Sequence, residues 1–181
     1  MKINDDSVSI ILSTYNEAPV IEDTIKNIFN TIEGVEIVLV DDNSTDGTLE
    51  KVKKFKDSNI KFFSRKERDL ASAFLLGLIN TTGNKIGWID SNMGDLIKFF
   101  PEMIEDLNDN DIILLSRFVE GGSDERSKLR VISSKLINFF SRLILSNKIK
   151  DYTSSIFIMK RSCLNSAVPI AYGHGEFFIE F

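Results

Sequence analysis

Three short polar segments of this chain carry the side chains best suited to binding a ligand. They are residues 13–17, 41–47 and 90–92, and each directly follows an apolar run. Their carboxylate and amide oxygens can accept hydrogen bonds from ribose hydroxyls and base N–H groups, and hard divalent cations prefer such oxygen ligands. The residues therefore predict a site for a nucleoside diphosphate that is bound through a metal ion.

Other nucleotide and metal sites fit the sequence less well. The first turn lacks the glycine fingerprint of dinucleotide-binding folds, and the chain has no Gly-rich loop that ends in Lys-Ser or Lys-Thr. A calcium loop counted from Asp42 would put Lys53 where the bidentate glutamate belongs. For residues 41–47 the plain alternative is a solvated turn with a helix N-cap, because Asp, Asn, Ser and Gly favour turns.

Alternating strand and helix patterns position these polar segments. Short apolar runs predict strands at residues 8–12, 35–40, 60–63, 86–89 and 112–115. Helical spacing of apolar residues predicts helices after Ala18 and over 49–55, 70–79 and 96–107. This alternation predicts an α/β fold: a single domain over residues 1–181, with a mainly parallel central sheet flanked by helices. Ligands of such sheets bind beyond the carboxyl ends of the strands, where the polar segments lie.

Composition narrows the class of protein further. A chain of 181 residues with 43% hydrophobic content fits one globular domain. The single cysteine, Cys163, and the charged residues 1–6 predict a reducing, cytosolic setting without a secretory signal. The net charge of −5 argues against nucleic acid as a partner. No apolar stretch reaches the roughly 18 residues that a membrane-spanning helix needs.

Residues 128–148 predict a helix that lies on a membrane surface. Ten large apolar residues alternate there with Lys and Arg, and the segment has no acidic residue. A helix of this kind binds anionic bilayers. The alternative is an ordinary helix packed on the core, since one apolar side would be buried in either case. Ser133, Ser134 and Asn138 interrupt the apolar surface, which favours a channel for a phosphate group.

Taken together, these residues resemble the family-two inverting glycosyltransferases of GT-A (Rossmann-like) fold, in the branch of dolichol-phosphate mannose synthase and the polyprenyl-phosphate glycosyltransferases. The resemblance covers nearly the whole chain. It rests on residues 14–17, 40–48, 89–93 with Pro101 and Glu102, 116–118 with Gly121 and Gly122, and 151–154. It implies transfer of a hexose, with inversion, from a GDP-mannose or UDP-glucose type of donor to dolichyl or undecaprenyl phosphate. It also implies Mg²⁺ or Mn²⁺ as cofactor and a peripheral position at the cytosolic face of a membrane.

The resemblance implies a role for individual residues. The nucleotide-sugar is expected to contact Thr14, Tyr15, Glu17, Asp41, Asp42 and Asp90. The metal is expected on Asp90 and Asn92, and the acceptor phosphate on Arg117, Arg130 and Ser134. Arg117 and Asp151 are the expected catalytic residues, with Asp151 organising the reaction centre. Glu180 resembles the segment that closes this type of domain.

The sequence departs from the family pattern at several of these positions. Asn92 stands where the family usually has a second aspartate, and Gly94 offers no side chain, so weaker metal affinity is expected. Ser155 replaces a glycine and Phe157 an arginine, which removes one cationic contact to phosphate, and Ser13 replaces a proline. Members of this branch continue where this chain stops. A membrane-anchoring partner or a further C-terminal segment is therefore expected.

The chemistry of the reaction fits these residues. The metal and Arg117 would neutralise the charge that grows on the leaving diphosphate. A phosphate acceptor is already anionic near neutral pH, because its second pKa lies near about 6, so no general base is required. His174, the single histidine, is expected to be a loop residue. Two alternatives stay open: a glycan or other soluble acceptor, and a catalytically degenerate domain that only binds nucleotide-sugar.

Overall fold

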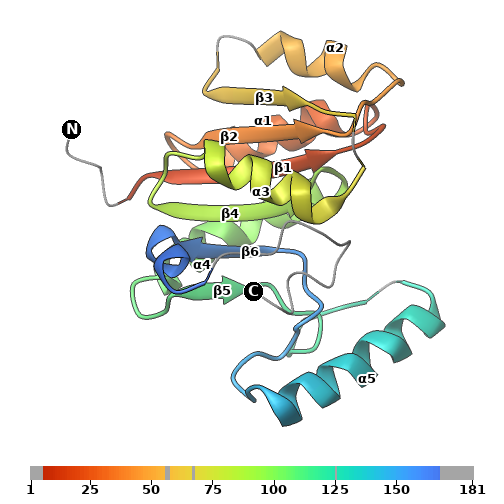
Figure 1. Cartoon of the computed structure of the whole chain (residues 1–181), viewed down its shortest axis with the longest axis vertical. Helices are drawn as coiled ribbons and strands as arrows, with labels where there is room; N and C mark the ends of the chain where they lie inside the picture. Colours follow the sequence, from red (N-terminus) through yellow and green to blue (C-terminus); the bar gives the residue numbers. More distant parts are fainter. Residues whose placement is uncertain (1–5, 56–57, 67, 125, 168–181) are drawn as a thin grey trace.

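A six-stranded, mostly parallel sheet forms the centre of the molecule (Figure 1). The computed structural model describes residues 6–55, 58–66, 68–124 and 126–167. The strand order is β3-β2-β1-β4-β6-β5. The strands are β1 (Val8–Thr14), β2 (Glu36–Asp41), β3 (Ile60–Ser64), β4 (Lys85–Asp90), β5 (Ile112–Leu114) and β6 (Phe157–Lys160). The predicted α/β architecture with a mainly parallel sheet is confirmed.

The antiparallel strand β6 is the main element that the sequence did not predict. It pairs with β4 on one side and with β5 on the other, antiparallel to both. It has four residues, and Phe157 at its start occupies the position where the family pattern has an arginine. Phe157 is 1% exposed, and its ring centroid lies 5.7 Å from that of Phe74. The missing arginine is thus replaced by a core residue.

Helices lie on both faces of the sheet and, apart from it, at one end of the molecule (Figure 1). They are α1 (Ile21–Thr31), α2 (Thr48–Val52), α3 (Leu70–Asn80), α4 (Phe100–Asp106) and α5 (Lys128–Ile144), with 3-10 turns η1 (Lys53–Phe55), η2 (Ser91–Phe99) and η3 (Arg161–Asn165). The helical segment predicted over 96–107 is present, but it begins as the 3-10 segment η2 and continues as α4. Pro101 lies in the first turn of α4, where its missing N–H leaves no hydrogen bond unmade.

Alternate residues of the strands supply two separate apolar cores. One core lies on the face that α1, η2 and α4 cover and includes Ile10 and Leu12 of β1. The other lies under α3 and includes the next residue of that strand, Ile11. At Gly77 of α3, a Cβ atom would lie 2.3 Å from Cγ2 of Ile11, so a glycine is needed for this close approach. The two cores fix the strand ends that carry the polar segments.

Helix α5 buries polar side chains and exposes apolar ones, which is the reverse of an ordinary surface helix. Its buried residues are Ser134 and Asn138, both polar. Large apolar side chains point into solvent on this helix and just after it: Leu129, Ile132, Leu136, Ile137, Phe139, Phe140, Leu143, Ile144 and Leu145. Figure 1 shows the helix standing apart from the sheet at one end of the molecule. The predicted helix is therefore present over Lys128–Ile144, but its apolar side does not join the core.

Two further structural facts bear on the sequence predictions. Across the described residues, no helix combines the length and the apolar character needed to cross a membrane. His174 and Glu180 lie outside the described residues, so the expectations for them are not addressed by the structure.

Candidate functional site

The strand register places the polar segments side by side at one edge of the sheet. Thr14, the last residue of β1, is paired with Asp41, the last residue of β2. Ser13 is paired in the same way with Asp90, the last residue of β4. The backbone N–H of Asp42 donates to the Thr14 carbonyl over 3.0 Å. These carboxyl ends form one continuous rim, which we call the strand-end rim (residues 13–17, 41–47 and 90–92).

Side chain to backbone hydrogen bonds connect the first two loops of the strand-end rim. The N–H of Asn16 donates to Ser44 Oγ over 2.8 Å, and the N–H of Thr45 donates to Asn16 Oδ1 over 2.9 Å. The N–H of Ala18 donates to Asp46 Oδ2 over 2.9 Å. Asn16 has a φ of 55°, in the left-handed region that asparagine tolerates better than most residues. The turn residues of both segments thus hold each other in place.

The neighbouring Asp41 and Asp42 have different surroundings. Asp41 is 1% exposed, and its carboxylate accepts hydrogen bonds from the N–H and the hydroxyl of Ser44. These hydrogen bonds from Ser44 hold the loop in its conformation. Asp42 forms an ion pair with Arg65, whose Nε lies 2.5 Å from Asp42 Oδ1, and Arg65 Nη1 also donates to Ser72 Oγ over 2.6 Å. Arg65 therefore fixes the orientation of the Asp42 carboxylate.

An aromatic residue and a cation lie together at the rim. Tyr15 is 37% exposed, and the guanidinium of Arg68 lies 3.7 Å from the centroid of its ring. This is a close cation–π contact. The sequence interpretation missed both Arg65 and Arg68, because a cation in a loop after a strand has no periodic pattern. The only signal was their position just after β3, which adjoins β2.

Acidic groups at the rim repel one another. Partial burial raises the pKa of Glu17, and repulsion from Asp46 and Asp90 raises it further. Burial also raises the pKa of Asp90, although hydroxyls of Ser13 and Ser155 donate to its carboxylate over 3.2 and 3.5 Å. A position where neighbouring carboxylates raise the pKa of Glu17 is also a favourable location for a cation.

The residues at the rim fit a divalent cation that is shared with a ligand. Among the described residues there is no group of three or more His, Cys, Asp or Glu side chains that could hold a metal alone. Asp90 is partly buried, and Asn92 is exposed at the start of η2. Mg²⁺ is commonly bound by one or two carboxylates together with substrate phosphates and water, and Mn²⁺ takes similar oxygen ligands. At Gly94 a Cβ atom would lie 2.5 Å from Thr24 Oγ1, so packing of η2 on α1 leaves no room for a third ligand side chain there.

The buried hydroxyl of Thr14 adds to the polar character of the rim. Thr14 is 4% exposed, and its Oγ1 has no hydrogen-bond partner within the described part of the chain. An unpaired buried polar group costs about 1–3 kcal/mol. A water molecule, an ion or a ligand bound at the rim could supply the partner.

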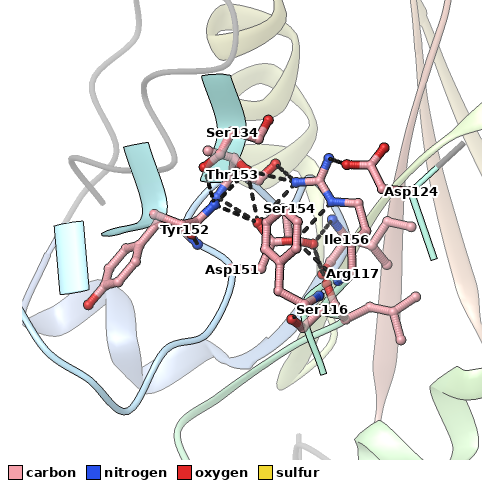
Figure 2. A network of polar contacts seen from close by, with 12 residues as sticks. Ser116, Arg117, Asp124, Ser134, Asp151, Tyr152, Thr153, Ser154 and Ile156 are labelled. Carbon is pink, nitrogen blue, oxygen red and sulfur yellow. Dashed lines mark hydrogen bonds and ion pairs between the residues drawn. The ribbon is translucent and has the colours of Figure 1, made fainter. Parts of the chain in front are cut away.

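Figure 2 shows a second polar cluster, which we call the Arg117–Asp151 network and which includes Thr153. Arg117 donates to Asp151 from Nε over 2.8 Å and from Nη2 over 2.9 Å. Arg117 Nη2 also donates to the carbonyl and the hydroxyl of Thr153, both over 2.7 Å. Ser155, at the end of the same segment, reaches Asp90 of the rim. The segment 151–155 therefore connects the network to Asp90, the expected metal ligand.

Asp151 is positioned to hold Arg117 and is poorly suited to accept a proton. Its side chain is fully buried. Burial raises the pKa of this carboxyl, but hydrogen bonds from Arg117 and Thr153 outweigh burial, and the pKa lies below its ordinary value. The expected catalytic pair is thus brought together as one unit, in which Asp151 orients the arginine.

Helix α5 joins this network through its two buried polar residues. Asn138 donates to Asp151 Oδ1 over 3.3 Å and to Thr153 Oγ1 over 3.1 Å, and it accepts from the N–H of Tyr152 over 2.5 Å. Ser134 accepts from Arg126 over 2.9 Å. Arg130, the third residue expected at the acceptor phosphate, is exposed on α5. Sequence reasoning missed Arg126, and it recognised Asn138 only as an interruption of the apolar surface.

Replacing Asp151 with asparagine is expected to lower the free energy of unfolding by about 3 kcal/mol, because Arg117 loses its main counter-ion inside the network. Since the folded-state pKa is depressed, the contribution of this carboxylate is present above its ordinary pKa and is lost as pH falls through the lower folded value. The difference from wild type should therefore shrink in acid. Urea unfolding at several pH values measures it.

The control for this variant is Asp111→Asn, which removes an 81% exposed carboxylate paired with Lys160. It should change stability by less than about 0.5 kcal/mol. Equal, small effects of both substitutions would show that Asp151 does not anchor the network.

The chain is similar in sequence and in structure to several known proteins. The family described as Glycosyl transferase family 2 matches residues 9–166. A dolichol-phosphate mannosyltransferase from Pyrococcus furiosus is 33% identical over 162 residues, which are 85% of this chain and 46% of that protein. Glucosyl-3-phosphoglycerate synthase from Mycobacterium tuberculosis, solved with Mn²⁺, UDP and phosphoglyceric acid, has a TM-score of 0.70 at 22% identity, over 95% of this chain and 61% of that one. A mannosyltransferase from Pyrobaculum calidifontis, solved with GDP-Man and Mn²⁺, has a TM-score of 0.55 at 21% identity, over 88% of this chain and 46% of that one.

These matches differ in what they establish. The chain spans less than two thirds of each of these relatives. At identities of 22% and 21%, the two solved structures show a shared fold, and they confirm the expected GT-A architecture.

Proposed function

Because this chain belongs to glycosyl transferase family 2, we propose that it transfers a hexose, with inversion, from a nucleotide-sugar to a polyprenyl phosphate at a membrane surface. The observation that supports this proposal best is the packing of α5. Its polar residues Ser134 and Asn138 lie inward against the Arg117–Asp151 network, and its apolar side chains lie outward. A membrane-embedded acceptor needs this combination of an apolar surface with cationic groups behind it.

The strand-end rim supports the donor half of the proposal. Tyr15, Glu17 and Asp42 offer an aromatic ring and carboxylates for the nucleoside, and Asp90 with Asn92 would hold a Mg²⁺ or Mn²⁺ ion. When bound, the ion would neutralise charge on the diphosphate as the bond to the sugar breaks. Arg117 would add bidentate hydrogen bonds to phosphate oxygens. The mannosyltransferase relative favours a GDP-mannose type of donor, and UDP-glucose remains the other candidate.

The state of Asp151 supports a phosphate acceptor over a hydroxyl acceptor. A hydroxyl must lose a proton to a general base, whereas a phosphate attacks as an anion. The pKa of Asp151 is lowered, and Arg117, Thr153 and Asn138 occupy its two oxygens. A carboxylate in this state is a weak base. The single domain, residues 1–181, would then work as a peripheral enzyme at the cytosolic face of a membrane, with a membrane-anchoring partner or segment.

One observation favours a second candidate, a degenerate domain that binds nucleotide-sugar without turning it over. The position of a second acidic ligand is taken by Asn92, and the described residues offer no three-residue metal cluster. This candidate predicts nucleotide binding with neither transfer nor hydrolysis of the donor.

The direct test is incubation with radiolabelled GDP-mannose or UDP-glucose and liposomes that contain a polyprenyl phosphate, with and without chelator. We expect label in the organic phase only when divalent metal is present. Label on a water-soluble glycan would instead support a soluble acceptor. Binding of donor without any product would support the degenerate domain.

Replacing Asn92 with aspartate is expected to tighten Mn²⁺ binding in the presence of nucleoside diphosphate by roughly tenfold, because a second anionic oxygen joins the site. The metal concentration for half-maximal activity should fall by a similar factor. The control is Asn108→Asp, which adds the same charge at an exposed position after α4. Equal metal affinities for both variants and wild type would remove Asn92 from the metal site.

A further inference from the structure

A carboxylate lies between two arginines at the inner side of α5. Asp124 accepts hydrogen bonds from Arg126 Nε over 2.8 Å and from Arg126 Nη2 over 2.6 Å. Its Oδ2 also lies 3.9 Å from Nη1 of Arg117. The Asp124 side chain is 7% exposed, so the two guanidinium groups nearly enclose it. Figure 2 shows Asp124 beside Arg117 at the edge of the network.

The charges around Asp124 are those of an anion-binding site. Arg117 already has a counter-ion of its own, the buried Asp151. Arg126 Nη2 donates to Ser134 Oγ over 2.9 Å, so a hydroxyl of α5 lies next to the same guanidinium. Hydrogen bonds from Arg126 lower the pKa of Asp124 to about 2. The position therefore strongly prefers an anion.

Beyond Arg117 and Ser134, which the sequence already led us to expect at the acceptor phosphate, we propose that Arg126 is a further phosphate ligand and that the Asp124 carboxylate occupies this position until the phosphate of the acceptor displaces it. The inference rests on the proposed function, because the acceptor supplies the phosphate. A carboxylate held by two N–H groups of one arginine is the nearest side-chain equivalent of a phosphate, which arginine binds with the same geometry. Arg126 thereby joins the residues that bind the acceptor.

The loop that carries Asp124 lies at the surface, outside the two apolar cores. Residues 120–123 are exposed, and Gly121 has a φ of 80°. Asp151, in contrast, is fully buried and bonded to several elements. The two carboxylates of the network thus differ: Asp151 stays on Arg117, and Asp124 is the one that an incoming anion replaces.

The position of the site favours a lipid phosphate over the donor diphosphate. Ser134 is buried on the inward side of α5, and Leu136, two residues further along, is exposed on the opposite side of the helix. A lipid with its chain along that surface would have its phosphate close to Ser134 and Arg126. The rim near Asp90 serves the donor.

The test is calorimetric titration of a water-soluble isoprenyl monophosphate of ten carbons into the whole chain, without donor. Asp124→Asn removes the competing charge and should tighten binding about tenfold. Arg126→Gln should weaken binding at least tenfold. Lys135→Gln, which removes an exposed cation from the same helix, should change it less than twofold. Parallel titrations with GDP or UDP and Mn²⁺ should give the same affinity for Asp124→Asn as for wild type.

Unchanged or weaker binding by Asp124→Asn would overturn the proposal, and so would unchanged binding by Arg126→Gln. If Asp124→Asn does not fold, the comparison of Arg126→Gln with Lys135→Gln decides alone. Tighter GDP or UDP binding by Asp124→Asn would assign the site to the donor and would also overturn it. This test needs no sugar transfer. Phosphate binding can therefore be found even if the transfer assay fails, and transfer can be found even if the titrations overturn the role of Asp124.

Discussion

Replacing Asp90 with asparagine is expected to lower the rate of sugar transfer at least about a hundredfold while the protein stays as stable as wild type or becomes more stable. The loss follows because Asp90 is the carboxylate proposed to hold the metal, and removing one preorganised electrostatic contact to a transition state costs about 10²–10³ in rate. The gain in stability follows because burial raises the pKa of Asp90. Above that raised pKa the charged form destabilises the fold, and asparagine removes the charge.

Two measurements check this result, initial rates at saturating metal and thermal unfolding near neutral pH. Asp109→Asn, an exposed carboxylate after α4, serves as control and should alter neither. Opposite changes in activity and stability are expected of a group that is retained for function. A variant that keeps more than a tenth of wild-type activity, or that loses stability together with activity, would show that Asp90 is a structural residue.

Replacing Leu136 and Leu143 together with serine is expected to reduce binding to anionic liposomes about a hundredfold or more. The two side chains are 56% and 73% exposed, and a leucine transferred fully from water to an apolar phase contributes roughly 1.5–3 kcal/mol. Because both already lie in water in the free protein, stability should change by less than about 1 kcal/mol. Flotation with liposomes measures the binding.

The kinetic consequence separates membrane docking from damage to the active site. Activity toward a polyprenyl phosphate in liposomes should fall with liposome binding, whereas activity toward a short, water-soluble isoprenyl phosphate should persist. Ile79→Ser removes a 70% exposed apolar side chain from α3 and should leave both activities intact. Equal losses on both acceptors would contradict a membrane role for α5.

The sequence predicted the rim well because strand ends are local features. The apolar run before Asp41 and the one before Asp90 each read as a strand, and parallel strands bring their carboxyl ends to one edge. The prediction could not separate Asp41 from Asp42, because neighbouring residues at a strand end point in different directions. Only the structure shows that Asp41 bonds to Ser44 within the loop and that Asp42 pairs with Arg65.

The sequence left two orientations of α5 open, because helical periodicity shows that a helix has two sides and not which side is buried. Ser134 and Asn138 lie four residues apart, but a pair of polar residues reads equally well as a solvent-facing stripe. Their burial follows from partners distant in sequence, such as Asp151. Arg126 was missed for the same reason: its role depends on how a loop closes against Arg117.

The proposed function depends on binding of a nucleoside diphosphate to the strand-end rim through a shared cation. The most direct measurement is an anomalous difference map from crystals grown with Mn²⁺ and GDP or UDP. We expect one strong peak in coordination contact with Asp90 and the diphosphate, with the nucleoside beside Tyr15 and Asp42. A nucleotide bound elsewhere on the molecule, or Mn²⁺ bound away from Asp90, would contradict it.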